Sequence, residues 1–209
     1  MSDSHEERLL LAMLARFEAE GLACYHEHAP HLATDAKSTL LDRLRDEGAD
    51  DDELSGSELW GPVGSVLRTA RSSGPTETLF VQGLLLEILG CTIYTAAAKA
   101  PMISDTGKQL AAQAIPACRA VVAMATTALV ETVGTGEPAF VEFADATHDV
   151  IAALDPIGEP VDAVFGERFD IRYSELIGDF TADLVAVCAD LDMPRRKVLA
   201  HLAGASMGF

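Results

Sequence analysis

The chain has 209 residues, of which 49 % are hydrophobic, and a formal net charge of −18. A chain of this length and composition can bury a full core as one domain. Binding to the backbone of a nucleic acid or to an anionic membrane surface needs a positive surface, and this chain has 15 basic against 33 acidic residues. We therefore predict a single domain over residues 1–209 that binds neither nucleic acid nor a membrane.

Helical periodicity dominates the chain, and no segment shows the alternation typical of a strand. Ser4 caps the first helix, with Glu7 three residues on, and Pro30 ends it after about His28. Short connections between the long helices predict an all-α fold, an antiparallel bundle of about four long helices with short helices added. An exposed acidic loop is expected over 46–58 and a loose tail over 205–209. The other helices are expected over about 34–48, 62–71, 76–99, 104–133, 138–154, 161–169, 174–191 and 194–204.

The cysteines and the N-terminal residues indicate the cellular compartment of the protein. The chain has 4 cysteines, each inside a different predicted helix, and no Cys-x-x-Cys pair of the kind found in zinc ribbons and redox dithiols. Buried, reduced thiols are typical of cytoplasmic proteins. The acidic segment 1–7 lacks the hydrophobic core of a signal peptide. We therefore predict a cytoplasmic protein.

One carboxylate stands in an almost uncharged stretch, because Glu87 and Asp105 are the only acidic residues within 78–130. Glu87 lies in the middle of the apolar run 79–89. A carboxylate in such surroundings must be paired, protonated or bound to a metal. We predict that Glu87 is buried and paired, with Arg119 or a tyrosine hydroxyl as its partner. A role as a metal ligand, or a place in a ligand pocket or interface, stays open.

Two consecutive predicted helices, over 78–98 and 109–130, are long enough to span a membrane. Gln82 and Glu87 lie within the first and Arg119 within the second, and no positive flank would orient insertion. We therefore predict a buried hairpin at the centre of the bundle or at the interface of a homodimer, since obligate interfaces are apolar.

Two Glu-x6-Tyr patterns stand in different predicted helices, Glu18 with Tyr25 and Glu87 with Tyr94. Seven residues make two helical turns, so each glutamate and its tyrosine lie on one ridge. A tyrosine in this position can hydrogen-bond the carboxylate of a neighbouring helix. Inward glutamates from several helices can also bind two iron or manganese ions, because hard cations take oxygen ligands.

The segment 82–97 carries Glu87, Tyr94 and a run of alanines. It resembles the first bundle helix of ferritin-like proteins, in which a glutamate is often followed seven residues later by a tyrosine and then by alanines. The resemblance covers one helix and implies a four-helix bundle with an iron or manganese centre held by carboxylates. Metal-binding members of that family also carry Glu-x-x-His on two helices, and the segment 110–119 of the next helix has no such pair.

The nearest match to Glu-x-x-His is Asp145-x-x-His148. Together with Glu142 these residues stand at i, i+3 and i+6 on one helix face. As metal ligands they would join Glu18 and Glu87. An ordinary solvated face of an amphipathic helix explains the same spacing, and we favour that interpretation.

Three of the 6 histidines, His26, His28 and His31, fall close together before and after Pro30. The carboxyl end of a helix favours histidine through the helix dipole, which explains the cluster without a metal. Metal binding or pH sensing stays open as the alternative role.

Other chemistries lack their motifs. The chain has no glycine-rich nucleotide-binding motif and no Gly-x-Ser-x-Gly elbow. Trp60, the only tryptophan, lies beside Gly61 and Pro62, and we interpret it as a packing anchor rather than a ligand platform.

Two functions follow from these patterns, and they differ on whether the chain is an enzyme. The first, which we favour, is a non-catalytic cytoplasmic helical-bundle protein without a cofactor, a homodimer with a ligand-binding or interaction role. The alternative is a ferritin-like metal protein with oxidative activity at an iron or manganese site. The metal ligands would be Glu18, Glu87, Glu142, Asp145 and His148, and the possible ligand or core partners are Tyr25, Tyr94 and Arg119.

Overall fold

The computed structural model describes residues 4–47 and 51–206, and no strand occurs in these two ranges. The prediction of an all-α fold is confirmed. The longer helices are α1 (His5–His28), α2 (Asp35–Asp46), α4 (Trp60–Thr69), α6 (Glu87–Lys99), α7 (Asp105–Thr132), α8 (Glu137–Leu154), α11 (Tyr173–Asp190) and α12 (Arg195–Ser206). The shorter pieces are η1 (Pro30–Leu32), α3 (Asp51–Ser55), α5 (Pro75–Thr78), η2 (Leu79–Leu86), η3 (Asp155–Ile157), α9 (Gly158–Val161), η4 (Asp162–Gly166) and α10 (Glu167–Phe169).

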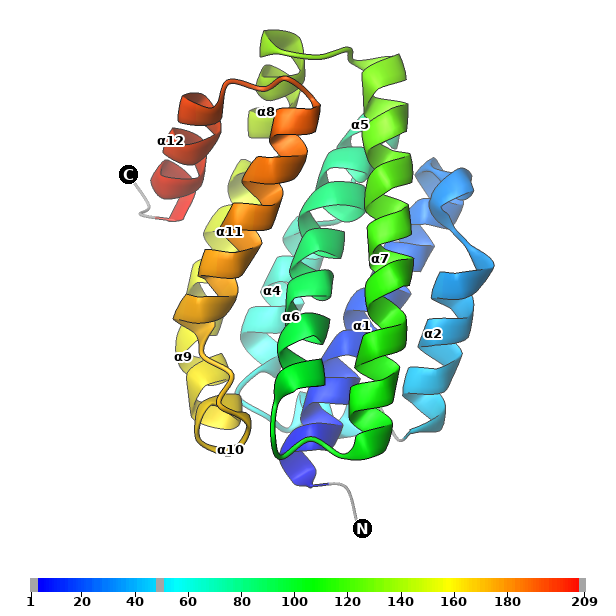
Figure 1. The fold of residues 1–209 in the computed structure, drawn as a ribbon, viewed down its shortest axis with the longest axis vertical. Helices are drawn as coiled ribbons and strands as arrows, with labels where there is room; N and C mark the ends of the chain where they lie inside the picture. The colour runs from blue at the N-terminus through cyan, green and yellow to red at the C-terminus, as the bar shows by residue number, and fades with distance from the viewer. Residues whose placement is uncertain (1–3, 48–50, 207–209) are drawn as a thin grey trace.

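The long helices lie side by side along the long axis of the molecule (Figure 1). A short connection joins α6 to α7 at one end, so these two helices run antiparallel, and α1 runs in the same direction as α7. Helix α2 packs against α1 and α7, whereas α11 packs against the other side of α6. Helices α7 and α11 therefore flank α6, and α1 packs against η2 (Leu79–Leu86), the piece that precedes α6. The ferritin-like arrangement of these helices stays a prediction.

Side-chain caps fix where three of the long helices begin. The Ser4 hydroxyl accepts a hydrogen bond from the Glu7 N–H (3.2 Å) at the start of α1. The Thr34 hydroxyl accepts one from the Lys37 N–H (3.3 Å) at the start of α2. Ser104 caps α7 in the same way. The first turn of a helix has N–H groups without intrahelical acceptors, so these side chains complete it.

Two predicted irregular segments are partly helical. Within the predicted loop 46–58, residues 51–55 form α3, and the loop prediction was wrong there. Its first residues are acidic, and the positive end of the helix dipole favours such residues. Helix α12 continues through Ser206, so the predicted tail 205–209 begins too early. Residues 48–50 and 207–209 lie outside the described residues.

The central helix is continuous over α5, η2 and α6. Its middle piece η2 has the wider winding of a π-helix, and the Glu87 N–H donates to the Gln82 carbonyl five residues back. Every residue of η2 is buried. At Gly83 an added Cβ would lie 2.7 Å from the Cβ of Ala125 in α7, so glycine allows the close approach of these two helices. A helix that is apolar on all sides fits a place at the centre of the fold.

Helix α7 has a similar composition and a different environment. Both α7 and the helix Pro75–Lys99 are long and apolar enough to cross a membrane by length and composition, which by itself is weak evidence. In the most apolar 18-residue stretch of each helix, 78 % of the central helix is buried, whereas only 28 % of α7 is buried. The inner face of α7 carries Ala114, Cys118, Val121, Ala125 and Leu129, and its opposite face is open.

Candidate functional site: a buried Glu–Lys–Glu network

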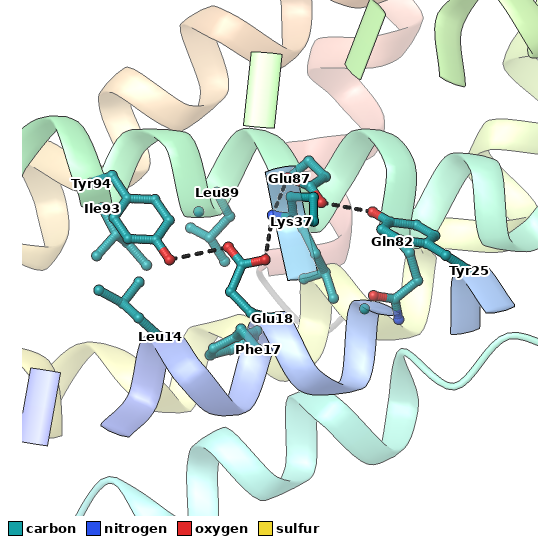
Figure 2. A pocket seen from close by; sticks show the side chains of 13 residues that line it. Leu14, Phe17, Glu18, Tyr25, Lys37, Gln82, Glu87, Leu89, Ile93 and Tyr94 are labelled. Carbon is teal, nitrogen blue, oxygen red and sulfur yellow. Dashed lines mark hydrogen bonds and ion pairs between the residues drawn. The ribbon is translucent and has the colours of Figure 1, made fainter. Parts of the chain in front are cut away.

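Three charged side chains meet between α1, α2 and α6. Glu18 comes from the middle of α1, Glu87 from the first residue of α6, and Lys37 from the first turn of α2. Their exposed fractions are 7 %, 7 % and 2 %. Figure 2 shows the three side chains pointing toward one another, with a tyrosine at each end of the group. Charged residues this deeply buried are rare in proteins unless they are paired.

The Lys37 ammonium lies between the two carboxylates. Its Nζ contacts Glu18 Oε2 and, at 3.0 Å, Glu87 Oε2. It also donates to the Cys118 Sγ of α7 at 3.7 Å. An ammonium has three protons, and each of them has an acceptor here. Lys37 therefore ties α2 to α1, α6 and α7 at one point.

The two tyrosines complete the network reciprocally. The Tyr25 hydroxyl of α1 donates to Glu87 Oε1 at 2.8 Å, and the Tyr94 hydroxyl of α6 donates to Glu18 Oε1 at 3.1 Å. Because α1 and α6 run antiparallel and share the same Glu–Tyr spacing, each tyrosine reaches the carboxylate of the other helix. The predicted bond from a tyrosine to a neighbouring carboxylate is confirmed. All buried side-chain nitrogen and oxygen atoms in the described part of the chain have partners.

The network has two carboxylates and one cation, and the pKa directions reflect that imbalance. Burial raises the pKa of Glu18; Lys37 lowers it again, and the Glu87 charge raises it further. Burial alone lowers the pKa of Lys37, but Glu87 and Glu18 together raise it by more, so the amine stays protonated. Burial, then the nearby carboxylates, raise the pKa of Tyr25 and of Tyr94. Both hydroxyls therefore remain donors.

Lys37 is the network residue that the sequence prediction missed. It precedes Leu40, Leu41 and Leu44 by three, four and seven residues, so it lies on the apolar stripe of α2. A lysine at a core position is a signal for a buried acidic partner, because an unpaired ammonium is too costly to bury. Cys118 also lies at a core position, four residues after Ala114 on the inner face of α7.

Of the two partners predicted for Glu87, the tyrosine hydroxyl is present and Arg119 is not. Arg119 lies one residue beyond the buried Cys118, and its side chain is exposed on α7. One residue along a helix turns a side chain by about 100°, which takes Arg119 away from the core. Lys37 and Tyr25 donate to the Glu87 carboxylate instead of Arg119.

The predicted ligands on α8 do not join Glu18 and Glu87. Glu142, Asp145 and His148 are all exposed. Phe143, Thr147 and Val150 occupy the buried face of this helix, so the three polar residues face outward. Their exposure agrees with the solvated-face interpretation, and the structure does not bring them together with Glu18 and Glu87. The His148 ring lies near His201 of α12, with 5.9 Å between the ring centroids.

The histidine cluster also stays at the surface. His26 and His31 are exposed and His28 is half-buried at the last residue of α1. His28 Nε2 lies 3.7 Å from the Glu27 carboxylate. Among residues 4–47 and 51–206, no three histidine, cysteine or acidic side chains are placed to hold a metal ion.

The donor set does not fit iron or manganese. Only Glu18 and Glu87 of the predicted ligands converge, and their facing oxygens both bind Lys37. Their other oxygens bind tyrosine hydroxyls. A di-metal centre of this type uses four carboxylates and two histidines, and Lys37 lies where the carboxylates would share an ion.

A small cavity adjoins the network, with a volume of about 30 Å³. Its wall includes Glu18, Tyr25, Lys37, Glu87 and Tyr94. A cavity of this size suits ordered water rather than an organic substrate. The arrangement holds protons and charges in place beside a space too small for a substrate.

Comparison with known proteins gives no family assignment for this chain. No protein family matches the chain, and no curated protein matches it.

Proposed function

We propose that this chain is a non-catalytic, metal-free helical-bundle protein that acts through association with a second copy of itself. The buried network is then a device of the fold and not a reaction centre. The observation that carries this proposal is the Lys37 ammonium between Glu18 and Glu87, which uses the oxygens that a metal would need. The cavity of about 30 Å³ supports it, because no substrate fits beside the network.

The network has a physical role without catalysis, which is to fix the register of the helices. Sliding α1 against α6 by one turn would break both tyrosine–carboxylate bonds and the contacts of Lys37 together. It would leave buried charges unpaired, which typically costs about 3–5 kcal/mol. Apolar packing alone tolerates such shifts far better, and buried polar groups are known to specify register in helical assemblies.

The outer face of α7 supports a homodimer. Pro116, Ala120, Ala123, Thr127 and Val130 are exposed there, in alternating steps of four and three residues. This spacing is that of a helix–helix seam, and small side chains let two helices approach closely. Between Lys108 and Glu131 the only charge in α7 is Arg119. Two copies with a net charge of −18 each can meet most easily at a face without negative charge.

The same proposal places the protein in the cytoplasm, with neither a nucleic acid nor a membrane as a partner. The four cysteines are free, and Cys91, Cys118 and Cys188 are buried. Burial raises the pKa of Cys188 to about 12, which favours the unreactive thiol form.

A charge placed on the outer face of α7 tests the association. We expect the wild type to sediment as a dimer of the 22.2 kDa chain and Ala123→Glu to sediment as a folded monomer with an unchanged circular dichroism spectrum. Val141→Glu, at a residue that is 56 % exposed on α8, is the matched control and should remain dimeric. A monomeric wild type, or equal behaviour of the two variants, would contradict the proposed interface.

A ferritin-like iron or manganese protein is the second candidate, favoured by Glu18 and Glu87 facing each other from antiparallel helices. It would require Lys37 to leave its place. Elemental analysis of protein purified without chelator separates the two, and we expect neither iron nor manganese. Near-stoichiometric metal that is lost in Glu87→Ala would support the second candidate and overturn the first.

A further inference from the structure

A second concave site lies at the surface between α1 and α4, away from the outer face of α7. It is a hollow of about 110 Å³ whose floor includes the buried side chains of Val63 and Leu67. Gly64 also borders it, and an added Cβ there would lie 3.4 Å from the Arg68 guanidinium. Arg68 therefore passes close to the backbone of Gly64 at the edge of the hollow.

Positive charge gathers around this hollow in a strongly negative protein. Arg16, Arg68 and Arg71 line it, and among the described side chains Glu20 is the only acidic one in its wall. Glu20 is shared, since one oxygen lies 3.0 Å from Arg16 and the other 3.6 Å from Arg71. Arg68 and Arg71 line the hollow beside this shared carboxylate, whereas the whole chain carries a net charge of −18. Such a cluster is favourable when an anion enters it.

The only tryptophan of the chain also borders the hollow. Trp60, at the first residue of α4, is 40 % exposed. A tryptophan that serves only as a packing anchor would be covered more fully. Packing therefore accounts for the buried part of the Trp60 side chain and not for its exposed part. An exposed indole beside arginine side chains offers a flat face for stacking.

We propose that this hollow binds a phosphate monoester that carries a planar aromatic group. A phosphate group is anionic, and the guanidinium forks of Arg68 and Arg71 match its oxygens in bidentate pairs. The hollow of about 110 Å³ is sized for a phosphate group rather than for a whole nucleotide. The aromatic group therefore lies outside it, on the exposed face of Trp60.

Titration with adenosine 5′-monophosphate at low ionic strength tests this site, with the fluorescence of Trp60 as the signal. Because the chain has one tryptophan, a saturable change reports this hollow directly. We expect the nucleotide to bind about tenfold more tightly than inorganic phosphate, because phosphate lacks the stacking contact. We expect adenosine alone to give no saturable change.

Two matched variants decide whether the hollow is responsible. Arg68→Gln should weaken nucleotide binding about tenfold, because it removes a charged hydrogen-bonding fork. Arg196→Gln, at an exposed arginine of α12 that does not line the hollow, makes the same change of net charge and should leave binding unaltered. Trp60→Phe, followed by calorimetry, should bring the affinity for the nucleotide close to that for phosphate.

Several outcomes would overturn the proposal. Absence of saturable binding to the wild type would remove the site altogether. Equal weakening by Arg68→Gln and Arg196→Gln would show that only the overall charge matters. Adenosine binding as tightly as the nucleotide would remove the phosphate contact, and inorganic phosphate binding as tightly would remove the stacking on Trp60.

Discussion

Two regions of this protein carry carboxylates at helical spacing, and they have opposite environments. Glu18 and Glu87 are 93 % or more buried and bind Lys37 and two tyrosines. Glu142 and Asp145 of α8 are exposed and border an open surface. Both regions offered possible metal ligands from the sequence, although a solvated face was favoured for α8. The difference shows that spacing selects a helix face, and that burial decides what a carboxylate on that face must do.

The physical reason is the cost of removing a charge from water. A buried carboxylate needs hydrogen bonds or an opposite charge, because the interior does not solvate it. An exposed carboxylate meets that need with water, and its ion pairs contribute little. We therefore expect substitutions in the buried network to affect stability strongly and the same substitutions on α8 to have almost no effect.

The largest effect is expected for Lys37→Met. This change keeps the length of the side chain and leaves two carboxylates facing each other without a cation. Removing one partner of a buried ionic group typically costs about 3–5 kcal/mol of unfolding free energy. Urea unfolding followed by circular dichroism measures it, with Asp145→Asn as the exposed control, expected within about 0.5 kcal/mol of the wild type. A Lys37→Met midpoint equal to that of the wild type would show that the ammonium does not hold the carboxylates.

A smaller effect is expected for Glu87→Gln. The amide nitrogen must face a donor, either Lys37 or the Tyr25 hydroxyl, and one hydrogen bond is lost. We expect a loss of about 1–3 kcal/mol in the same unfolding measurement. Glu142→Gln on α8 is the matched control and should leave stability unchanged. If the two variants unfold alike, the buried and exposed carboxylates do not differ as we describe.

The smallest effect is the pH dependence of Glu18→Gln. The pKa of Glu18 is raised in the folded protein by burial, so the native state binds its proton more tightly than the unfolded chain. That contribution is fully present below the unfolded pKa of about 4.3 and is lost as the pH rises through the folded pKa. Glutamine cannot titrate, so the stability of Glu18→Gln relative to the wild type should increase over this window.

Denaturant unfolding at a series of pH values measures this difference. The other carboxylates titrate in both proteins, so only the gap between the two curves reports Glu18. Asp145→Asn should give a curve parallel to that of the wild type. Parallel curves for Glu18→Gln as well would mean that Glu18 is solvated like the carboxylates of α8.

Particular residues show how far the sequence leads. Ser4 as a cap, Pro30 as a stop and the isolation of Glu87 are local signals, and each was interpreted correctly because a helix end or an apolar run depends on near neighbours. The partner of Glu87 was predicted only in part. Tyrosine hydroxyls were expected, whereas Lys37 lies 50 residues away and its place depends on how α2 packs.

The sequence by itself determined that this protein is helical, that its central helix is buried and that Glu87 needs a partner, because periodicity and the cost of burying charge act along the chain. Only the tertiary structure decided that Glu18, Lys37 and Glu87 share one network while Glu142, Asp145 and His148 stay in solvent. It also gathered three arginines beside Trp60. Those placements depend on the directions in which helices far apart in the sequence cross, and spacing within one helix carries no information about that.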